Sequence, residues 1–185
     1  VSNKFAIKVI DKSKLADVKA MKRVIAERDV MANLKEVHPC IVRLHFAFQD
    51  DSHLFFVMDC LKTDLYKMVQ GLPGMRVPVD GVRLYLAELV LALEFLHDQH
   101  IIFMDVKLEN LLVSERGHVQ LADFGLARYS DLELQSTLVG TPSYFSPEML
   151  LGTMKHNQTM DVWAFGIVAF ELLCGLHPFD DSGSA

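Results

Sequence analysis

The segment from Thr159 to Cys174 constrains the fold most, because it is apolar on almost every side of a helix. A helix with this pattern must be enclosed by other elements, so we expect a buried central helix. Gly175 and Pro178 follow it and predict where it ends. The longest apolar stretch, residues 163–176, is 14 residues long and contains Glu171, which makes it too short for a membrane span.

The first third of the chain has the pattern of strands around one helix. Residues 4–10, apolar apart from Lys4 and Lys8, indicate a short strand, and residues 41–49 and 53–58 indicate two more. Between them, apolar residues at helical spacing predict a helix over residues 17–36, which His38 and Pro39 would end.

The rest of the chain has a mainly helical pattern. Residues 63–69 predict a short helix with Thr63 as its N-cap, and residues 80–97 predict a longer one. Residues 101–122 resemble short strands around loops, and residues 123–150, rich in Gly, Pro, Ser and Thr, predict an extended loop. A β-rich part followed by a helical part predicts an α+β fold.

Composition excludes several classes of function. Apolar residues make up 51% of the 185 residues and charged residues 23%, which is not the composition of a disordered chain. A net charge of -6 does not suit phosphate neutralisation, so we expect no nucleic-acid partner. Cys40, Cys60 and Cys174 are too few and too scattered for a disulfide framework or a zinc site. They predict a reducing, intracellular location, cytoplasmic or nuclear.

Three polar segments interrupt apolar surroundings. Lys8 lies within the first predicted strand, residues 104–110 contain Asp105, Lys107 and Asn110, and Asp123 precedes a glycine after another apolar strand. Carboxylate and amide oxygens suit Mg²⁺, and ammonium groups suit phosphate. Phosphoryl transfer needs this combination of metal and positive charge at one point.

Six stretches, in order along nearly the whole chain, resemble the motifs of the eukaryotic protein kinases. They are FAIKVI, ERDVM, FMDVKLEN, ADFG, GTPSYFSPE and DVWAFG. YLAELVLALEFLHDQHIIF, STLVGTPSYFSPEML and HPFDD are most similar to the AGC group, whereas MDCLKTDLYKMV is similar to the hinge of mitogen-activated or cyclin-dependent kinases. We favour the AGC group, because more residues support it.

The resemblance implies a bilobal kinase fold and an enzyme that transfers the γ-phosphoryl group of ATP, with Mg²⁺, to Ser or Thr of a protein substrate. It implies a partial small lobe over residues 1–61 and an incomplete large lobe over residues 62–185. Asp105 would accept or orient the proton of the attacking hydroxyl, and Lys107 would lie near the γ-phosphate. Thr141 would hydrogen-bond to both. Asn110 and Asp123 would hold Mg²⁺.

The resemblance also implies the nucleotide contacts. Lys8 would contact the α- and β-phosphates when paired with Glu27. The remaining implied contacts surround adenine: Met58 at the back of the pocket, Asp59 and Leu61 through backbone groups, and Ala6 and Leu112 on the two faces of the ring.

Departures from the family pattern leave a second class of function open. Only seven residues precede Lys8, so we expect the glycine-rich loop that covers the phosphates to lie outside this sequence, as in a piece of a longer chain. Met104 stands where the family usually has an arginine, which would grip a phosphate on Thr137. We therefore expect a truncated catalytic domain with little activity alone, in which Thr137 phosphorylation has a weak ordering effect. The alternative is a pseudokinase that binds or scaffolds without efficient chemistry.

Several site residues also have an ordinary structural interpretation. Lys8 could be a solvated lysine of an edge strand, and Asp105 and Asp123 could be turn residues. Glu27 could belong to a charged helix face with Arg28. The intact set of Lys8, Asp105, Lys107, Asn110 and Asp123 favours the enzyme.

Overall fold

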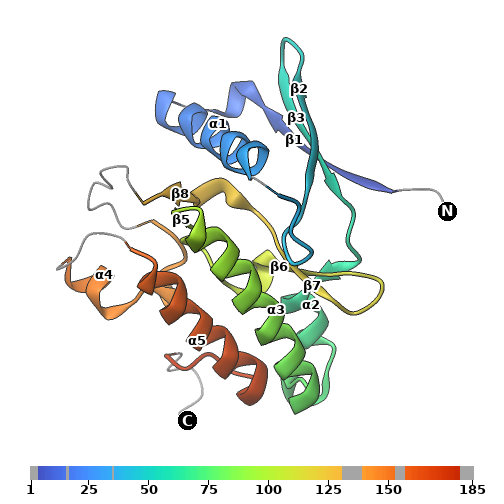
Figure 1. The fold of residues 1–185 in the computed structure, drawn as a ribbon, viewed down its shortest axis with the longest axis vertical. Helices are drawn as coiled ribbons and strands as arrows, with labels where there is room; N and C mark the ends of the chain where they lie inside the picture. Colours follow the sequence, from blue (N-terminus) through green and yellow to red (C-terminus); the bar gives the residue numbers. More distant parts are fainter. Residues whose placement is uncertain (1–3, 16, 35, 131–138, 153–156, 180–185) are drawn as a thin grey trace.

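The computed structural model describes residues 4–15, 17–34, 36–130, 139–152 and 157–179. In Figure 1, a small sheet with one helix lies above a larger part built mainly from helices. The helices are α1 (Val18–Asn33), α2 (Leu65–Gln70), α3 (Val79–Asp98), α4 (Pro147–Leu151) and α5 (Thr159–Cys174). The strands are β1 (Phe5–Asp11), β2 (Leu44–Gln49), β3 (His53–Asp59), β4 (Thr63–Asp64), β5 (Ile101–Ile102), β6 (Leu111–Val113), β7 (Val119–Leu121) and β8 (Arg128–Tyr129). This arrangement confirms the predicted α+β fold, with a small β-rich part and a helical part.

The upper sheet is antiparallel, with the strand order β1-β3-β2. α1 begins after Asp17, whose carboxylate accepts a hydrogen bond from the backbone N of Ala20 at 2.6 Å. The helix ends at Asn33, earlier than residue 36, because Leu34 already has ψ of 120°. His38 and Pro39 therefore belong to the loop that leads to β2.

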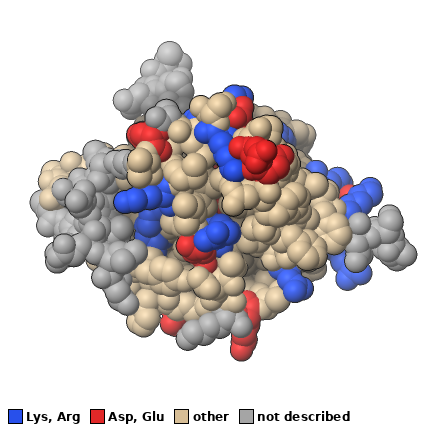
Figure 2. Space-filling view, turned by 90° about the horizontal axis from the view of Figure 1, so that it is seen from above, with Lys and Arg blue, Asp and Glu red and all other residues tan. Residues whose placement is uncertain are grey.

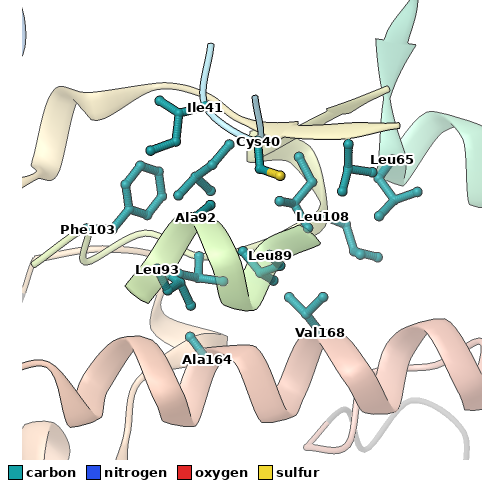
Figure 3. Close-up of a cluster of buried hydrophobic side chains, with 14 of the residues drawn as sticks. Cys40, Ile41, Leu65, Leu89, Ala92, Leu93, Phe103, Leu108, Ala164 and Val168 are labelled. Atoms are coloured by element: carbon teal, nitrogen blue, oxygen red, sulfur yellow. The ribbon is translucent and has the colours of Figure 1, made fainter. Parts of the chain in front are cut away.

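A single apolar core joins the upper and lower parts. Met31 of α1 and Ile41 lie in the same buried cluster as Leu93 of α3. The backbone N of Val42 donates to the carbonyl of Leu121 at 3.0 Å, and that of Leu121 donates to Cys40 at 2.8 Å. Figure 3 shows side chains of α3 packed against Ala164 and Val168 of α5. The predicted boundary after Leu61 therefore crosses a continuous core and remains a prediction.

α5 has the predicted bounds, but it is buried on one side only. Val168 and Leu172 are fully buried, whereas Val162 is 59% exposed and Leu173 46% exposed. The expectation of a helix enclosed on every side is therefore wrong for the described residues. Among these residues, no helix is both long and apolar enough to cross a membrane.

Two local predictions need correction. Thr63 is not the N-cap of α2 but part of β4, and the cap is Asp64, whose carboxylate accepts from the backbone N of Lys67 at 2.8 Å. The carboxylate reaches the first turn of α2 from a strand that pairs with β6. Residues 123–150 are also more regular than a plain loop, since their described part contains β8, α4 and 3₁₀ turns at Phe124–Leu126 and Pro142–Tyr144.

Candidate active site

The first part of the site links β1, α1 and the segment after β7. Lys8 Nζ donates to Glu27 Oε1 at 2.7 Å and to Asp123 Oδ1 at 3.2 Å. β1 alternates exposed and half-buried residues, and Lys8 falls on the half-buried face. The Glu27 side chain is only 4% exposed, so it is not part of a solvated charged face. The structure thus contradicts the ordinary interpretations of Lys8 and Glu27.

The charge of Lys8 is stabilised by its partners. Burial disfavours the ammonium form, but the carboxylates of Glu27 and Asp123 outweigh burial and raise the pKa of Lys8 above its usual value. Lys8 therefore stays cationic at neutral pH and can serve as a counter-charge for an anion.

The second part of the site is a hydrogen-bonded cluster around Asp105. Lys107 Nζ lies 2.8 Å from Asp105 Oδ2 and donates to Thr141 Oγ1 at 2.9 Å. Thr141 Oγ1 donates to Asp105 Oδ1 at 2.8 Å. Asn110 Nδ2 donates to the carbonyl and to Oδ2 of Asp105, at 2.8 and 2.9 Å. The structure brings all four predicted residues together, although Thr141 is 36 residues from Asp105.

A buried carboxylate of α5 holds the backbone just before Asp105. Asp161 is 1% exposed and accepts from the backbone N atoms of Phe103 and Met104, at 2.9 and 2.8 Å. Met104 has a left-handed φ of 71°, which costs free energy for a residue other than glycine. His97 Nε2 lies 2.8 Å from Asp161 Oδ2, so the Asp161 carboxylate contacts this ring as well as the two backbone N atoms.

The segments that carry Asp105 and Asp123 lie side by side. The backbone N of Ala122 donates to the carbonyl of Asn110 at 2.9 Å. Phe103 and Phe124 are both fully buried, and their rings meet edge to face with centroids 5.2 Å apart. Phe103 therefore fills an apolar slot against Phe124, and this contact fixes the two segments relative to each other.

The donor atoms of Asn110 and Asp123 fit a small divalent cation. Because Asn110 donates its Nδ2 to Asp105, its Oδ1 is oriented as an acceptor. Asp123 bonds to Lys8 through Oδ1, and its side chain is 54% exposed. Magnesium commonly takes one or two protein oxygens and completes its shell with phosphates and water. The described residues contain no cluster of three or more His, Cys, Asp or Glu, so a cation here would need such further ligands.

The residues predicted to surround adenine are placed in part. Ala6 and Met58 are register partners on adjacent strands, and both are half-buried. Asp59 ends β3, and Leu61 follows in the connection to the lower part. Leu112 lies on β6, paired with Gln120, and its position across from Ala6 remains a prediction. Thr137 lies outside the described residues.

A pair of acidic side chains adjoins the cluster. Tyr144 Oη donates to Glu171 Oε2 at 2.7 Å. Burial raises the pKa of Glu171 to about 7, the Tyr144 hydrogen bond opposes this, and the negative charge of Glu109 adds to the increase. Burial and the same two carboxylates raise the pKa of Tyr144. Neither Glu109 nor Glu171 forms an ion pair within the described part of the chain.

Sequence reasoning did not assign a role to Asp161, His97, Tyr144 or Glu171. One signal was available, because Asp161 and Glu171 are acidic residues within an otherwise apolar helix, and a buried acid needs partners. The partners themselves lie 27 to 64 residues away, so no local pattern identifies them. Figure 2 shows acidic and basic side chains interspersed on the face seen from above.

Comparison with known proteins gives one consistent result. The family model described as "protein kinase domain" matches residues 1–185. The chain is 36% identical over 181 residues to the cAMP-dependent protein kinase catalytic subunit of Arthrobotrys oligospora, covering 97% of this chain and 34% of that protein. It is 38% identical over 184 residues to atypical protein kinase C of Drosophila melanogaster, covering 98% and 30%. It is 39% identical over 178 residues to ribosomal protein S6 kinase alpha-3 of Mus musculus, covering 95% and 23%.

These relatives bear on the predicted subgroup and on the extent of the chain. They include a cyclic-nucleotide-dependent kinase and a ribosomal S6 kinase, which confirms the predicted resemblance to the AGC group. The chain spans about a third of the length of the first relative and less of the other two.

Proposed function

The chain belongs to the protein kinase domain family, and we propose that it takes part in the transfer of the γ-phosphoryl group of ATP to Ser or Thr of a protein. The observation that carries this proposal is the cluster of Asp105, Lys107 and Thr141 beside the Lys8–Asp123 pair. The Asp105 carboxylate is held by Lys107 and by hydrogen bonds from Thr141 and Asn110, and the Asp123 carboxylate by the Lys8 ammonium. Such positioning is the main contribution a protein makes to phosphoryl transfer.

Asp105 would act on the acceptor. Its carboxylate is fixed by Lys107, Thr141 and Asn110, so it can orient a substrate hydroxyl and accept its proton as the new P–O bond forms. The bond between the γ-phosphorus and the bridging oxygen breaks, and ADP leaves with that electron pair. Lys107 would stabilise the negative charge on the transferred group.

Lys8 and Asp123 would hold the nucleotide. The cationic Lys8 would contact the α- and β-phosphates while Glu27 keeps it oriented at 2.7 Å. Asn110 and Asp123 would hold Mg²⁺, which when bound supplies positive charge against the phosphate oxygens. Ala6, Met58, Asp59, Leu61 and Leu112 would surround adenine. The division into residues 1–61 and 62–185 and the cytoplasmic or nuclear location belong to the same proposal.

The scaffolding alternative has less support. A module without chemistry has no need for Asp105 and Lys107 to lie 2.8 Å apart, or for Thr141 to bridge them. The relatives named above are all kinases by name. Met104 removes the arginine expected before Asp105, but it leaves these contacts in place.

The acidic pair suggests the chemical class of the protein substrate. Glu171 is half-buried beside the charge of Glu109, and Tyr144 is its hydrogen-bond donor. A cation that approached both carboxylates would reduce their mutual repulsion. We therefore expect preferred substrates to carry an arginine or lysine near the acceptor residue.

The Asp105→Asn variant tests the reaction. We expect phosphoryl transfer from Mg-ATP to a mixture of Ser/Thr peptides to fall by about a hundredfold or more, because the base is lost. Binding of Mg-ATP should be unchanged, since Asp105 acts on the acceptor. Equal transfer by Asp105→Asn and the parent chain would contradict the proposal.

A peptide pair tests the substrate class. A peptide with arginine near its acceptor should be preferred over the same peptide with norleucine in place of that arginine. The preference should shrink about tenfold in Glu109→Gln, because removing one carboxylate removes one charge-assisted contact. No difference between the two peptides would rule out the acidic pair as a substrate contact.

A further inference from the structure

A β-bulge places a histidine against the segment that connects the two parts of the molecule. The register between β2 and β3 shifts between Leu44 and Phe46, so that His45 is the extra residue. A bulge redirects the side chain of the extra residue. Here His45 Nε2 lies 2.7 Å from Asp59 Oδ1, at the last residue of β3.

The Asp59 carboxylate is held from two sides. Its second oxygen, Oδ2, accepts from the backbone N of Arg43 at 3.1 Å, and the Asp59 backbone N donates to the Arg43 carbonyl at 3.2 Å. The His45 ring meets the ring of Phe5 edge to face, with centroids 4.9 Å apart. Phe5 is in turn the register partner of Asp59 on β1. The last residue of β3 is therefore fixed by both neighbouring strands.

The connection beyond Asp59 is less well packed. Cys60 is exposed, and a hollow of about 700 Å³ borders Asp59, Cys60 and Leu61 on this side. Apolar packing thus contributes little to the orientation of this connection. Its beginning is held by the contacts of the Asp59 side chain, and its end by the backbone N of Lys62, which donates to the carbonyl of Val113 at 2.9 Å. Asp59 and Leu61 are the residues whose backbone groups are proposed to hydrogen-bond to adenine.

We propose that His45 is a positioning residue for nucleotide binding: through its contact with the Asp59 carboxylate it fixes the backbone of the adenine-binding connection. The inference rests on the proposed function. His45 itself touches neither the nucleotide nor the reacting atoms, because its side chain lies on the same face of the sheet as Phe5, opposite to Ala6 and Lys8. It therefore affects the affinity for adenine and not the contacts of the phosphates.

Three probes separate this role from a general structural one. Calorimetric titrations of the full chain would use Mg-ATP, adenosine, and magnesium tripolyphosphate, which lacks the adenine ring. In His45→Ala we expect the dissociation constants for ATP and adenosine to rise by the same factor, about three- to tenfold, while tripolyphosphate binds as before. His45→Gln can place an amide N–H near the position of Nε2 and should stay within about twofold of the parent chain. His45→Asn is the matched control for His45→Gln. It carries the same amide group, but its shorter side chain should not reach Asp59, so it should bind as weakly as His45→Ala.

Pairwise coupling gives a second measurement. His45→Ala should have no further effect on ATP affinity when Asp59→Ala is already present, because the contact is then already lost. Unchanged adenosine binding in His45→Ala, or equal losses for adenosine and tripolyphosphate, would overturn the positioning role. It would also be overturned if His45→Gln bound as weakly as His45→Ala. Failure of the parent chain to bind Mg-ATP would instead overturn the proposed function, and this inference with it.

Discussion

Glu171 is a single side chain whose protonation couples stability to pH. Its pKa is raised to about 7 because it is partly removed from water and lies near the charge of Glu109. In the unfolded chain the same carboxyl titrates near pH 4.5. Between these two values the folded state binds the proton more tightly, so the free energy of unfolding falls as pH rises through this window.

We therefore expect Glu171→Gln to reduce the dependence of the free energy of unfolding on pH. The amide is neutral at every pH and still offers an oxygen to the Tyr144 hydroxyl, so the variant should match the parent chain near pH 5 and exceed its stability at pH 8. Urea unfolding midpoints at both pH values would measure the difference. Glu115→Gln, at an exposed position, is the control and should behave as the parent chain does. An undiminished difference between pH 5 and pH 8 in Glu171→Gln would show that another group is responsible.

Among the secondary-structure elements, the end of α5 and the 3₁₀ turn Pro73–Met75 form a close junction. The guanidinium Nε of Arg76 donates to the carbonyl of Cys174 at 2.9 Å, and the backbone N of Val77 donates to Leu172 at 3.0 Å. Gly175 has φ of +74°, and a Cβ added there would lie 2.1 Å from the carbonyl oxygen of Gly74. Only glycine allows the two backbones to approach this closely.

Gly175→Ala should therefore destabilise the protein more than Gly152→Ala does. Gly152 has a similar φ of +61° but nothing within 4 Å of an added Cβ, so its substitution costs only the left-handed conformation, about 1–2 kcal/mol. Gly175→Ala adds the displacement of α5 from the 3₁₀ turn, which we expect to cost about 1–3 kcal/mol more. Urea denaturation of both variants measures the difference between their free energies of unfolding. If the two variants lost the same free energy of unfolding, α5 and the 3₁₀ turn could separate without cost in stability.

At the level of the whole molecule, the candidate site draws residues from both parts. Lys8 and Glu27 come from the upper part, and Asp105 and Asp123 from the lower part. A nucleotide bound between them would contact both and stabilise the folded state by mass action. At a concentration one hundred times the dissociation constant, the gain is about 2.7 kcal/mol.

We expect Mg-ATP to raise the midpoint of thermal unfolding more than ATP with a chelator does. Asp123→Ala should remove the part of the increase that depends on magnesium. Alanine also tolerates the left-handed φ of 65° at this position less well than aspartate, so the increase is measured for each protein against its own midpoint without ligand. Magnesium without nucleotide is the control for non-specific stabilisation. If the parent chain and Asp123→Ala respond equally to Mg-ATP, Asp123 does not hold the metal.

The elements and motifs that depend on neighbouring residues could be predicted from the sequence. α5 has the predicted bounds because an apolar pattern sixteen residues long is a local property. The spacing of Asp105, Lys107 and Asn110 likewise places them in one short loop, within reach of each other. The predicted N-cap of α2, Thr63, is wrong by one residue: Thr63 and Asp64 both pair with β6, and Asp64 is the cap because the helix begins at Leu65.

Contacts between distant segments could not be predicted in this way. Whether Glu27 is buried or solvated depends on where β1 and the Asp123 segment pack, and not on the residues beside it in α1. The same holds for Tyr144 with Glu171 and for His45 with Asp59, which packing brings to within 2.7 Å. Periodicity and residue chemistry act over a few residues, so they identify elements and reactive groups. Burial and pairing depend on how the whole chain packs, and for that reason the environment of each charged group came only from the folded molecule.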